Sequence, residues 1–315
     1  MPRLAHTTAF SLALIGAMAV SGCSSPARES DDAATEMRTV SHLYGTTDIP
    51  VDPRRVVVLD AGNVLESVLA LGVVPVATVV PKSTGTWPDF IADKLPEDVI
   101  SVGNSEADVE LEEVIKADPD LIIVTSEDES QREFYDNVSG IAPTVAVGDV
   151  ANEWKETLRI LGDHLGKQDV ATTLLADYSD RVESTREVLG PNPGTASFIR
   201  VRADTLNYMG QEGAFIWTTP REVGLRAPDH QNVGTAEDSF FEVSLEQTNL
   251  LDADRIFVVT DGAAAEPGQF LDTVRSNPLF GLLQGDIEFL PSNAYLFGSI
   301  MKANKMLDVL ESGTQ

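Results

Sequence analysis

A helix–turn–strand unit occurs twice in this chain, and this repeat constrains the fold more than any other feature. The two copies, LEEVIKADPDLIIVT at 111–125 and LEQTNLLDADRIFVV at 245–259, begin 134 positions apart. Each copy has the pattern of a short helix, a turn and a buried strand. The repeat predicts two structurally related lobes, each containing one copy. Aligned without gaps, the copies share these pairs: Leu111/Leu245, Glu112/Glu246, Asp118/Asp252, Asp120/Asp254, Ile122/Ile256 and Val124/Val258.

Apolar runs with strand character alternate with helical patterns on both sides of the chain's middle. Such alternation is typical of parallel sheets covered by helices on both faces. The expected fold class is therefore α/β, with two parallel-sheet lobes and a ligand cleft between them. In the first lobe the expected strands are 55–60, 73–80, 98–103, 121–125 and 143–148; in the second they include 196–202, 254–260 and 287–291.

A single long helix is expected to join the lobes. Residues 167–190 have apolar positions on one helical face, and the sequence PNPG at 191–194 ends the pattern. The predicted organisation is a signal peptide at 1–22, a lipidated flexible tether at 23–40, an N-terminal lobe at 41–150, connecting helices at 151–190 and a C-terminal lobe at 191–315.

The N-terminus has the pattern of an exported lipoprotein. Arg3 precedes an apolar run at 9–20, which is too short to cross a bilayer but suits a signal peptide. The sequence VSGC that follows resembles the lipobox of bacterial lipoproteins, in which the cysteine, here Cys23, is lipidated. Cys23 is the chain's only cysteine, so the alternative is a free thiol that falls here by coincidence. We expect a lipid-anchored protein on the outer face of the cell membrane.

The charge balance excludes one class of partner. There are 22 Lys and Arg residues against 50 Asp and Glu, a net charge of −28. Such a chain repels nucleic acid and anionic membrane surfaces. We therefore expect no nucleic-acid binding, membrane contact through the Cys23 lipid only, and a monomer without a cofactor.

Taken together, several segments resemble the iron–siderophore-binding proteins of ABC importers, the substrate-binding class with a rigid helix between lobes. The segments are the lipobox, 44–77, 117–125, 135–145 and 298–310. The resemblance covers essentially the whole mature chain, and it rests on the order and spacing of the segments. It implies a ferric siderophore bound between the lobes and handed to an importer permease.

In that family, a glutamate on each lobe docks onto arginines of the permease, and the matching positions here are Glu112 and Glu246. The alternative is that each is an ordinary acidic residue in the first turn of a helix, where the helix dipole favours it. An exposed ion pair adds only about 0–1 kcal/mol. Docking of this kind would therefore contribute orientation and encounter rate more than affinity.

Loops at the carboxyl ends of the strands are the usual ligand edge of such sheets. Trp87 lies in one such loop, at 81–90. Arg200 and Arg202 lie two apart and hence on one face of a strand, where an arginine is costly unless it meets an anion. Arg202 could instead pair with Asp204. The family commonly places an arginine here against ligand oxygens.

Three further aromatic residues are candidate ligand contacts. Tyr208 matches the place where the family has an aromatic residue after the arginine. Trp217 and Tyr295 lie in segments expected to be loops, although Trp217 could be a core residue.

The ligand class is suggested by a departure from the family pattern. Many relatives have Lys or Arg after the fourth strand, whereas this chain has the acidic residues Glu127, Asp128 and Glu129. Like-charge repulsion would disfavour a strongly anionic complex. We therefore expect a neutral or cationic ferric hydroxamate of the ferrioxamine kind.

Haem or a corrinoid is the nearest alternative ligand. Haem would require an axial ligand such as His or Tyr. His42, His164 and His230 remain after removal of the signal peptide, and none lies in a ligand motif. No cluster of His and carboxylates has the spacing of a metal site.

An enzyme is the alternative of another class, together with a purely structural surface lipoprotein. Ser299 and Lys302 satisfy the S-x-x-K motif of penicillin-binding proteins, but the accompanying S-D-N and K-T-G motifs are absent from the sequence. We expect no enzymatic activity and no catalytic residues.

Overall fold

The computed structural model describes residues 36–81, 85–103, 108–126, 131–148, 153–201, 205–235, 238–260, 272 and 275–312. Cys23, Arg202 and the acidic segment 127–129 lie outside the described residues, so the hypotheses about them stay predictions. The described residues belong to one unit, Thr35–Gln315.

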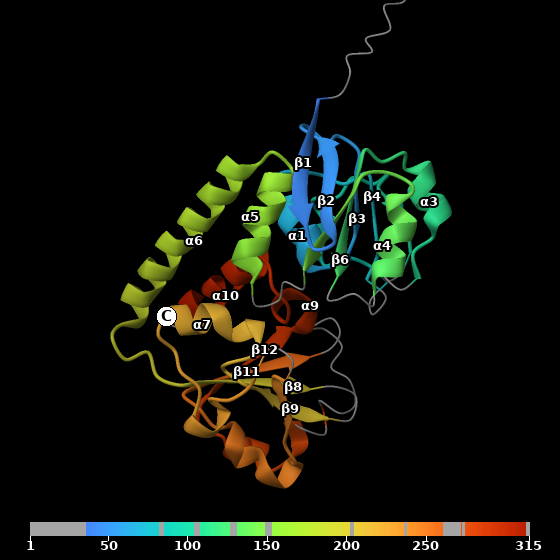
Figure 1. Cartoon of the computed structure of the whole chain (residues 1–315). Coiled ribbons are helices and arrows are strands. Elements are labelled where there is room, and N and C mark those ends of the chain that lie inside the picture. Colours follow the sequence, from blue (N-terminus) through green and yellow to red (C-terminus); the bar gives the residue numbers. More distant parts are fainter. Residues whose placement is uncertain are drawn as a thin grey trace, which may run out of the picture. The chain divides into compact units, whose positions relative to one another are not determined.

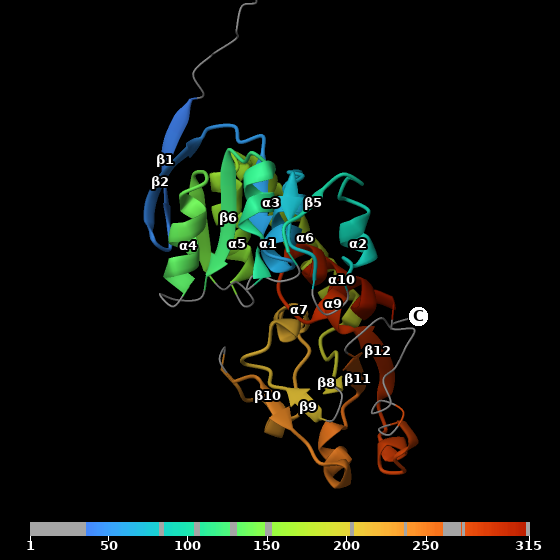
Figure 2. The same ribbon diagram turned by 90° about the vertical axis from the view of Figure 1, so that its right-hand side faces the viewer.

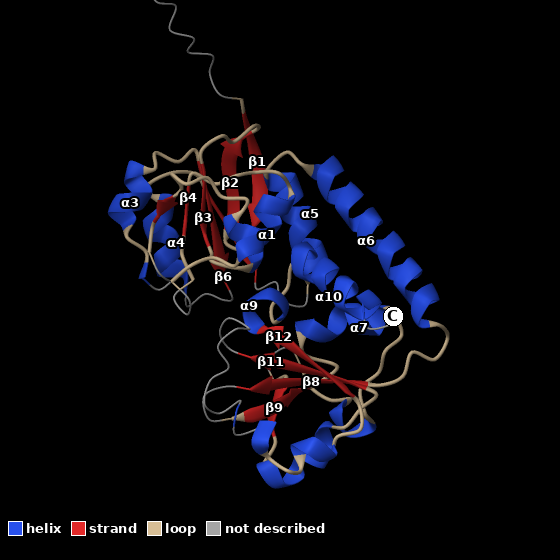
Figure 3. Ribbon diagram, turned by 180° about the vertical axis from the view of Figure 1, so that it is seen from behind, coloured by secondary structure: helices blue, strands red, loops and turns tan. Residues whose placement is uncertain are grey.

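The first lobe contains a five-stranded parallel sheet, as predicted (Figure 1). Its central strand β3 has four apolar residues that are all buried, because helices cover both faces of the sheet. Figure 3 shows α1 on one side of this sheet and α3 and α4 on the other. The order across the sheet is β5 (Ile100–Ser101), β4 (Ala77–Thr78), β3 (Val56–Leu59), β6 (Leu121–Ser126) and β7 (Thr144–Gly148).

An antiparallel hairpin precedes this sheet and was not predicted. Its strands are β1 (Met37–His42) and β2 (Gly45–Pro50). The strand β1 begins inside the predicted tether at 23–40, so ordered structure starts earlier than expected. A backbone hydrogen bond from Leu43 to Ala146 joins the hairpin turn to β7.

The second sheet has the equivalent order but mixed directions (Figure 2). Strand β11 runs parallel to β8 and β12, whereas β9 runs antiparallel to both β8 and β10. The prediction of a parallel sheet in the second lobe was therefore wrong for β9, because β8 and β9 are paired as an antiparallel hairpin. The order is β10 (Phe240–Glu242), β9 (Leu206–Met209), β8 (Ala196–Val201), β11 (Arg255–Thr260) and β12 (Asp286–Pro291).

One long helix, α6, connects the two lobes, as the sequence predicted. The last helix, α10, packs against helices of both lobes, namely α1, α5, α6, α7 and α9. The helices are α1 (Asn63–Ala70), α2 (Asp89–Ala92), α3 (Leu111–Lys116), α4 (Arg132–Ser139), α5 (Trp154–His164), α6 (Gln168–Leu189), α7 (Thr218–Glu222), α9 (Ser292–Tyr295) and α10 (Ile300–Ser312), with 3-10 turns η3 (Phe215–Trp217), η4 (Asp229–Gln231), η5 (Leu245–Leu251) and η6 (Phe280–Leu282).

The repeated unit occupies the same place in both lobes. Its strands, β6 and β11, each lie beside the strand that comes first in the chain within their five-stranded sheet, β3 and β8. The carboxylate of Asp120 accepts hydrogen bonds from the backbone N–H groups of Arg54 and Arg55, just before β3, at 2.8 and 2.9 Å. Its counterpart Asp254 accepts the backbone N–H and the hydroxyl of Thr195, just before β8, at 2.7 and 2.9 Å. The shared aspartates therefore hold the start of β3 in one lobe and of β8 in the other.

A buried ion pair joins the first lobe to the last helix. Lys302 Nζ on α10 lies 2.9 Å from Glu66 Oε1 on α1, and the two side chains are 5% and 3% exposed. The hydroxyl of Ser299 donates a hydrogen bond to the other oxygen of Glu66. The two polar members of the S-x-x-K match are thus both bound to a carboxylate in the core.

Candidate functional site

The carboxyl ends of the strands in the first lobe gather a cluster of two tyrosines and an arginine. The hairpin turn brings Tyr44 to the end of β6, where its hydroxyl is hydrogen-bonded to that of Ser126. The Tyr44 and Tyr135 rings lie 4.9 Å apart, and the Arg132 guanidinium lies 5.1 and 5.8 Å from their centroids. Arg132 Nε also donates to Asp136 at 3.1 Å. Two rings and a carboxylate therefore hold an exposed cation at this edge.

Two histidines tie the hairpin to this lobe. His42 packs against the Tyr135 ring at 5.4 Å and is hydrogen-bonded to Thr47, while His164 is hydrogen-bonded to the Ser41 carbonyl at 3.1 Å. Burial lowers the pKa of His164, and burial together with the charges of His164 and Arg132 lowers the pKa of His42. Both imidazoles are thus held in environments that favour the neutral form.

Trp87 lies half-buried in the loop that follows β4. Its indole N–H donates to the Val79 carbonyl at 3.1 Å, and its ring packs against the main core. Nearby on α2, Phe90 carries Lys305 of α10 over its ring at 4.8 Å. The backbone bond fixes the orientation of the indole while part of the ring stays accessible.

The second sheet separates two of the predicted ligand residues. Arg200 stacks on the Phe240 ring at 5.2 Å. Tyr208 is paired with Ile199, one residue before Arg200, and its ring stacks on Phe241 at 5.2 Å. Because successive residues of a strand point to opposite faces, Arg200 and Tyr208 lie on opposite faces of the sheet. One ligand cannot meet both side chains at this position of the sheet.

The other two aromatic candidates differ in exposure. Trp217 is 0% exposed, its ring contacts Phe198 at 4.8 Å, and its N–H donates to the Met209 carbonyl at 2.8 Å. The expectation of a loop aromatic at this position was wrong, because η3 turns the indole into the core. Tyr295 is half-buried at the end of α9, where burial and the charges of Glu288 and Asp308 raise its pKa.

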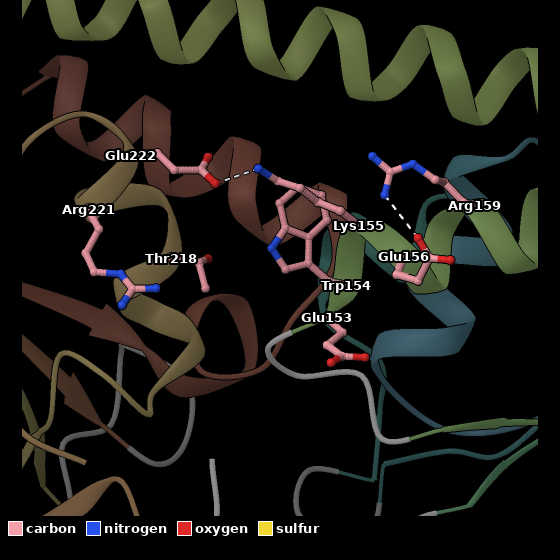
Figure 4. A pocket seen from close by; sticks show the side chains of 8 residues that line it. All are labelled: Glu153, Trp154, Lys155, Glu156, Arg159, Thr218, Arg221 and Glu222. Atoms are coloured by element: carbon pink, nitrogen blue, oxygen red, sulfur yellow. Dashed lines mark hydrogen bonds and ion pairs between the residues drawn. The ribbon is translucent and has the colours of Figure 1, made fainter. Parts of the chain in front are cut away.

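A cavity of about 420 Å³ lies between α5 and α7 (Figure 4). Its size lies in the range of about 300–1,000 Å³ usual for small-molecule sites. Lys155 and Glu222 form an ion pair at 2.5 Å on one side of it, and Tyr178 donates to Glu222 at 2.8 Å. Of the predicted ligand residues that the structure describes, none lines it. The lining residues are Glu153, Trp154, Lys155, Glu156, Arg159, Thr218, Arg221 and Glu222.

The two predicted docking glutamates occupy equivalent, exposed positions. Glu112 lies in the first turn of α3 and Glu246 in the first turn of η5. Docking would require exposed glutamates at equivalent positions, and both residues meet this requirement. Docking itself stays a prediction.

The described residues contain no group of three or more His, Cys, Asp or Glu side chains arranged to hold a metal ion. In the same part of the chain, no helix has the length and apolarity needed to span a membrane.

Comparison with known proteins identifies the family. Residues 56–284 match the family described as periplasmic binding protein. The chain belongs to this family, which confirms the resemblance inferred from the sequence.

Two relatives from Bacillus subtilis (strain 168) are each 33% identical to this chain. "Probable siderophore-binding lipoprotein YfiY" matches over 199 residues, which cover 62% of this chain and 60% of that protein. "Iron(3+)-hydroxamate-binding protein YxeB" matches over 183 residues, which cover 56% and 51%. The matched part is thus less than two thirds of either relative.

Solved structures confirm the two-lobed α/β fold. Staphylococcus aureus SirA complexed with staphyloferrin B has a TM-score of 0.72 and 26% identity, covering 87% of this chain and 97% of that one. Bacillus subtilis FeuA complexed with ferri-bacillibactin has a TM-score of 0.68 at 19% identity, covering 88% and 98%. At that lower identity the likeness shows the fold alone.

Sequence reasoning missed Tyr44 and Arg132 as candidate site residues. Arg132 directly precedes the EFYD sequence, the place where the family pattern has a basic residue, so this signal was available. Tyr44 carries no such local signal, because only the pairing of the hairpin with the first sheet brings it to the end of β6.

Proposed function

We propose that this chain is an extracytoplasmic solute-binding lipoprotein that captures a ferric siderophore and delivers it to an ABC importer permease. The observation that carries the proposal is family membership combined with relatives named for siderophore binding. Residues at the strand ends of both lobes, Trp87, Arg200 and Tyr295 among them, would contact the chelate. Arg202 and Tyr208 are the weaker candidates of the predicted set, and Trp217 is no longer one, because its side chain is a core residue with 0% exposure.

We propose a hydroxamate chelate as the ligand. The name of the relative YxeB supports this class, as does the acidic segment 127–129, which would repel a strongly anionic complex. A second ligand class is favoured by Arg132, because its cation at the strand edge would attract a carboxylate or catecholate chelate. FeuA, whose solved structure resembles this chain, is described as a triscatecholate siderophore binding protein.

Attachment and delivery complete the proposal. Lipidation of Cys23 would anchor the protein at the outer face of the cell membrane, provided that more than one acyl chain is attached. Glu112 and Glu246 would then orient the two lobes on the permease.

Tryptophan fluorescence tests the ligand. Residues 24–315 are titrated with ferrioxamine, ferric citrate, haemin and cobalamin. Saturable quenching by ferrioxamine, strongly reduced in Trp87→Phe, is the expected result, because Trp154 and Trp217 are core residues with 2% and 0% exposure. Quenching by ferric citrate alone would mean that the ligand is an anionic chelate and not a hydroxamate. Quenching by haemin alone would mean that the ligand is haem and not a siderophore. No response to any of the four, nor to a ferric catecholate added as a fifth ligand, would refute the proposed function.

A further inference from the structure

The turn between β1 and β2 is held by the histidine at its start. The backbone N–H of Tyr44 donates to His42 Nδ1, with 3.2 Å between the two nitrogens. The acceptor is thus a side chain two residues earlier, as in an Asx turn, with imidazole in place of the usual Asn or Asp. The preceding N–H, of Leu43, donates to the Ala146 carbonyl of β7 instead. Backbone therefore fixes the turn to the first sheet, whereas an imidazole orients the Tyr44 peptide.

This contact determines which ring nitrogen carries the proton. An imidazole nitrogen that accepts a hydrogen bond is unprotonated, so the proton of the neutral ring lies on Nε2. His42 Nε2 lies 2.9 Å from the Thr47 hydroxyl and 3.3 Å from that of Tyr135, and either oxygen can accept its proton. Both nitrogens of the neutral ring are thus in use. A second proton has to bind at Nδ1, where the Tyr44 N–H already points.

The surroundings of His42 oppose that second proton. In the described part of the chain, the titratable or charged groups around the ring are His164 on α5, Arg132 and Tyr135 on α4, and Tyr44 in the turn. None of these four groups is a carboxylate. Burial lowers the pKa of His42, and the charges of His164 and Arg132 lower this pKa further. A protonated ring would therefore set a donor against a donor, close to a guanidinium.

Tyr44 carries the effect to the strand-end cluster of the first lobe. Its hydroxyl is hydrogen-bonded to that of Ser126 at the end of β6, and the Arg132 guanidinium lies 5.1 Å from its ring centroid. The ring and the peptide N–H belong to the same residue, so a change in the peptide orientation also moves the ring. The placement of Arg132 over that ring then changes as well.

We propose that His42 is a positioning residue, which holds Tyr44 and Arg132 in the arrangement that meets the ligand while its Nδ1 is unprotonated. The proposal rests on the proposed function, in which the strand ends of the first lobe contact the chelate. Acid lowers the affinity in two ways, because Tyr44 loses its hydrogen bond and the imidazolium adds positive charge beside Arg132. Added positive charge disfavours the neutral or cationic hydroxamate that we expect. The protein would thus hold its ligand less tightly in acidic surroundings.

Amide NMR of the isotope-labelled residues 24–315, recorded between about pH 7.5 and 5, tests the contact. The Tyr44 amide and the ring nitrogens of His42 should titrate together, with one midpoint below the ordinary value for histidine. His42→Asn supplies a side-chain oxygen that can accept the Tyr44 N–H in a true Asx turn, so the Tyr44 amide should no longer respond to pH. His42→Ala has no acceptor, and its Tyr44 amide should match the acid form at every pH.

His230→Asn is the matched control. The same substitution is made in the second lobe, where His230 Nε2 is hydrogen-bonded to the Leu250 carbonyl at 2.6 Å, and the Tyr44 amide should titrate as in the unchanged protein. A Tyr44 amide that stays constant while His42 titrates would overturn the proposal. A pH response of this amide that persists in His42→Asn would overturn it too.

Ligand affinity provides the second readout. Between about pH 7.5 and 5, the affinity for ferrioxamine should fall about fivefold in the unchanged protein, as for the loss of one hydrogen bond. In His42→Asn the affinity should be the same at both pH values, and circular dichroism checks that each protein is folded at both. An equal fall in the two proteins would show that another group causes the pH dependence, and would overturn the proposal.

The two readouts separate this inference from the proposed function. Joint titration of His42 and Tyr44, combined with ferrioxamine binding that does not depend on pH, overturns the positioning role and leaves the proposed function standing. Joint titration combined with no siderophore binding at either pH leaves the pH-dependent contact in the turn and removes the proposed function.

Discussion

Removing the cation from the buried pair between Glu66 and Lys302 should strongly destabilise the protein. Lys302→Met preserves most of the side-chain volume but leaves the Glu66 carboxylate, 3% exposed, without its cation. Breaking a buried pair in this way is expected to lower the free energy of unfolding by about 3–5 kcal/mol. The hydroxyl of Ser299 still donates to Glu66, so we expect a loss near the lower end of that range.

A double-mutant cycle shows whether the loss comes from the unpaired charge. Combining Lys302→Met with Glu66→Leu removes both charges, and the double variant should recover most of the stability, because apolar replacement of a buried pair is often neutral. Unfolding by guanidinium chloride, followed by circular dichroism, gives the midpoint and the slope of each variant.

Lys116→Met is the matched control. Lys116 pairs with Glu113 on the surface, where its side chain is 62% exposed, so the loss should be about 0–1 kcal/mol. A loss in Lys302→Met no larger than that of the control would refute the reasoning. A double variant less stable than either single variant would do the same.

Three further predictions concern pH, the repeat and docking. Because burial lowers the pKa of His42 and His164 below the ordinary value for histidine, the unfolded state binds more protons, and the Tm should fall as the pH drops from about 6.5 to 5. Replacing both histidines with Gln should flatten the profile measured by scanning calorimetry. Asp254→Ala removes the acceptor of two Thr195 hydrogen bonds and should lower the free energy of unfolding by about 1 kcal/mol because the site is exposed, and an unchanged denaturation midpoint would contradict its role. Glu112→Gln combined with Glu246→Gln should reduce siderophore uptake by cells without changing siderophore affinity, and a parallel loss of both would place these residues in the ligand site instead.

The helices and strands that could be predicted from sequence are those that their own pattern of apolar residues identifies. Strands β3, β6 and β7 are continuous apolar runs buried on both faces, and α6 has one apolar face and a glycine at its end. Each of these signals lies within the element itself, so the neighbours of the element are not needed.

The elements that were missed depend on partners far away in the chain. The direction of β9 follows from its pairing with β8, which the local pattern does not encode. Trp217 is a core residue because Phe198 and the Met209 carbonyl meet it in three dimensions. The contact between Tyr44 and Ser126 spans 82 positions and depends on the hairpin lying beside β7. The candidate site was therefore harder to predict than the fold, because it is made almost entirely of such contacts.

The buried pair also has a consequence for the order in which the chain is made. Glu66 and Ser299 are 233 positions apart, so at about 5–20 residues per second roughly 12–47 seconds separate their synthesis. Throughout that interval the carboxylate on α1 has neither its hydroxyl donor nor its cation. Without Ser299 and α10, the Glu66 carboxylate would lack both partners, so we expect the first lobe to be less stable than in the whole protein. The stability of the first lobe thus depends on a helix more than 200 positions further along the chain.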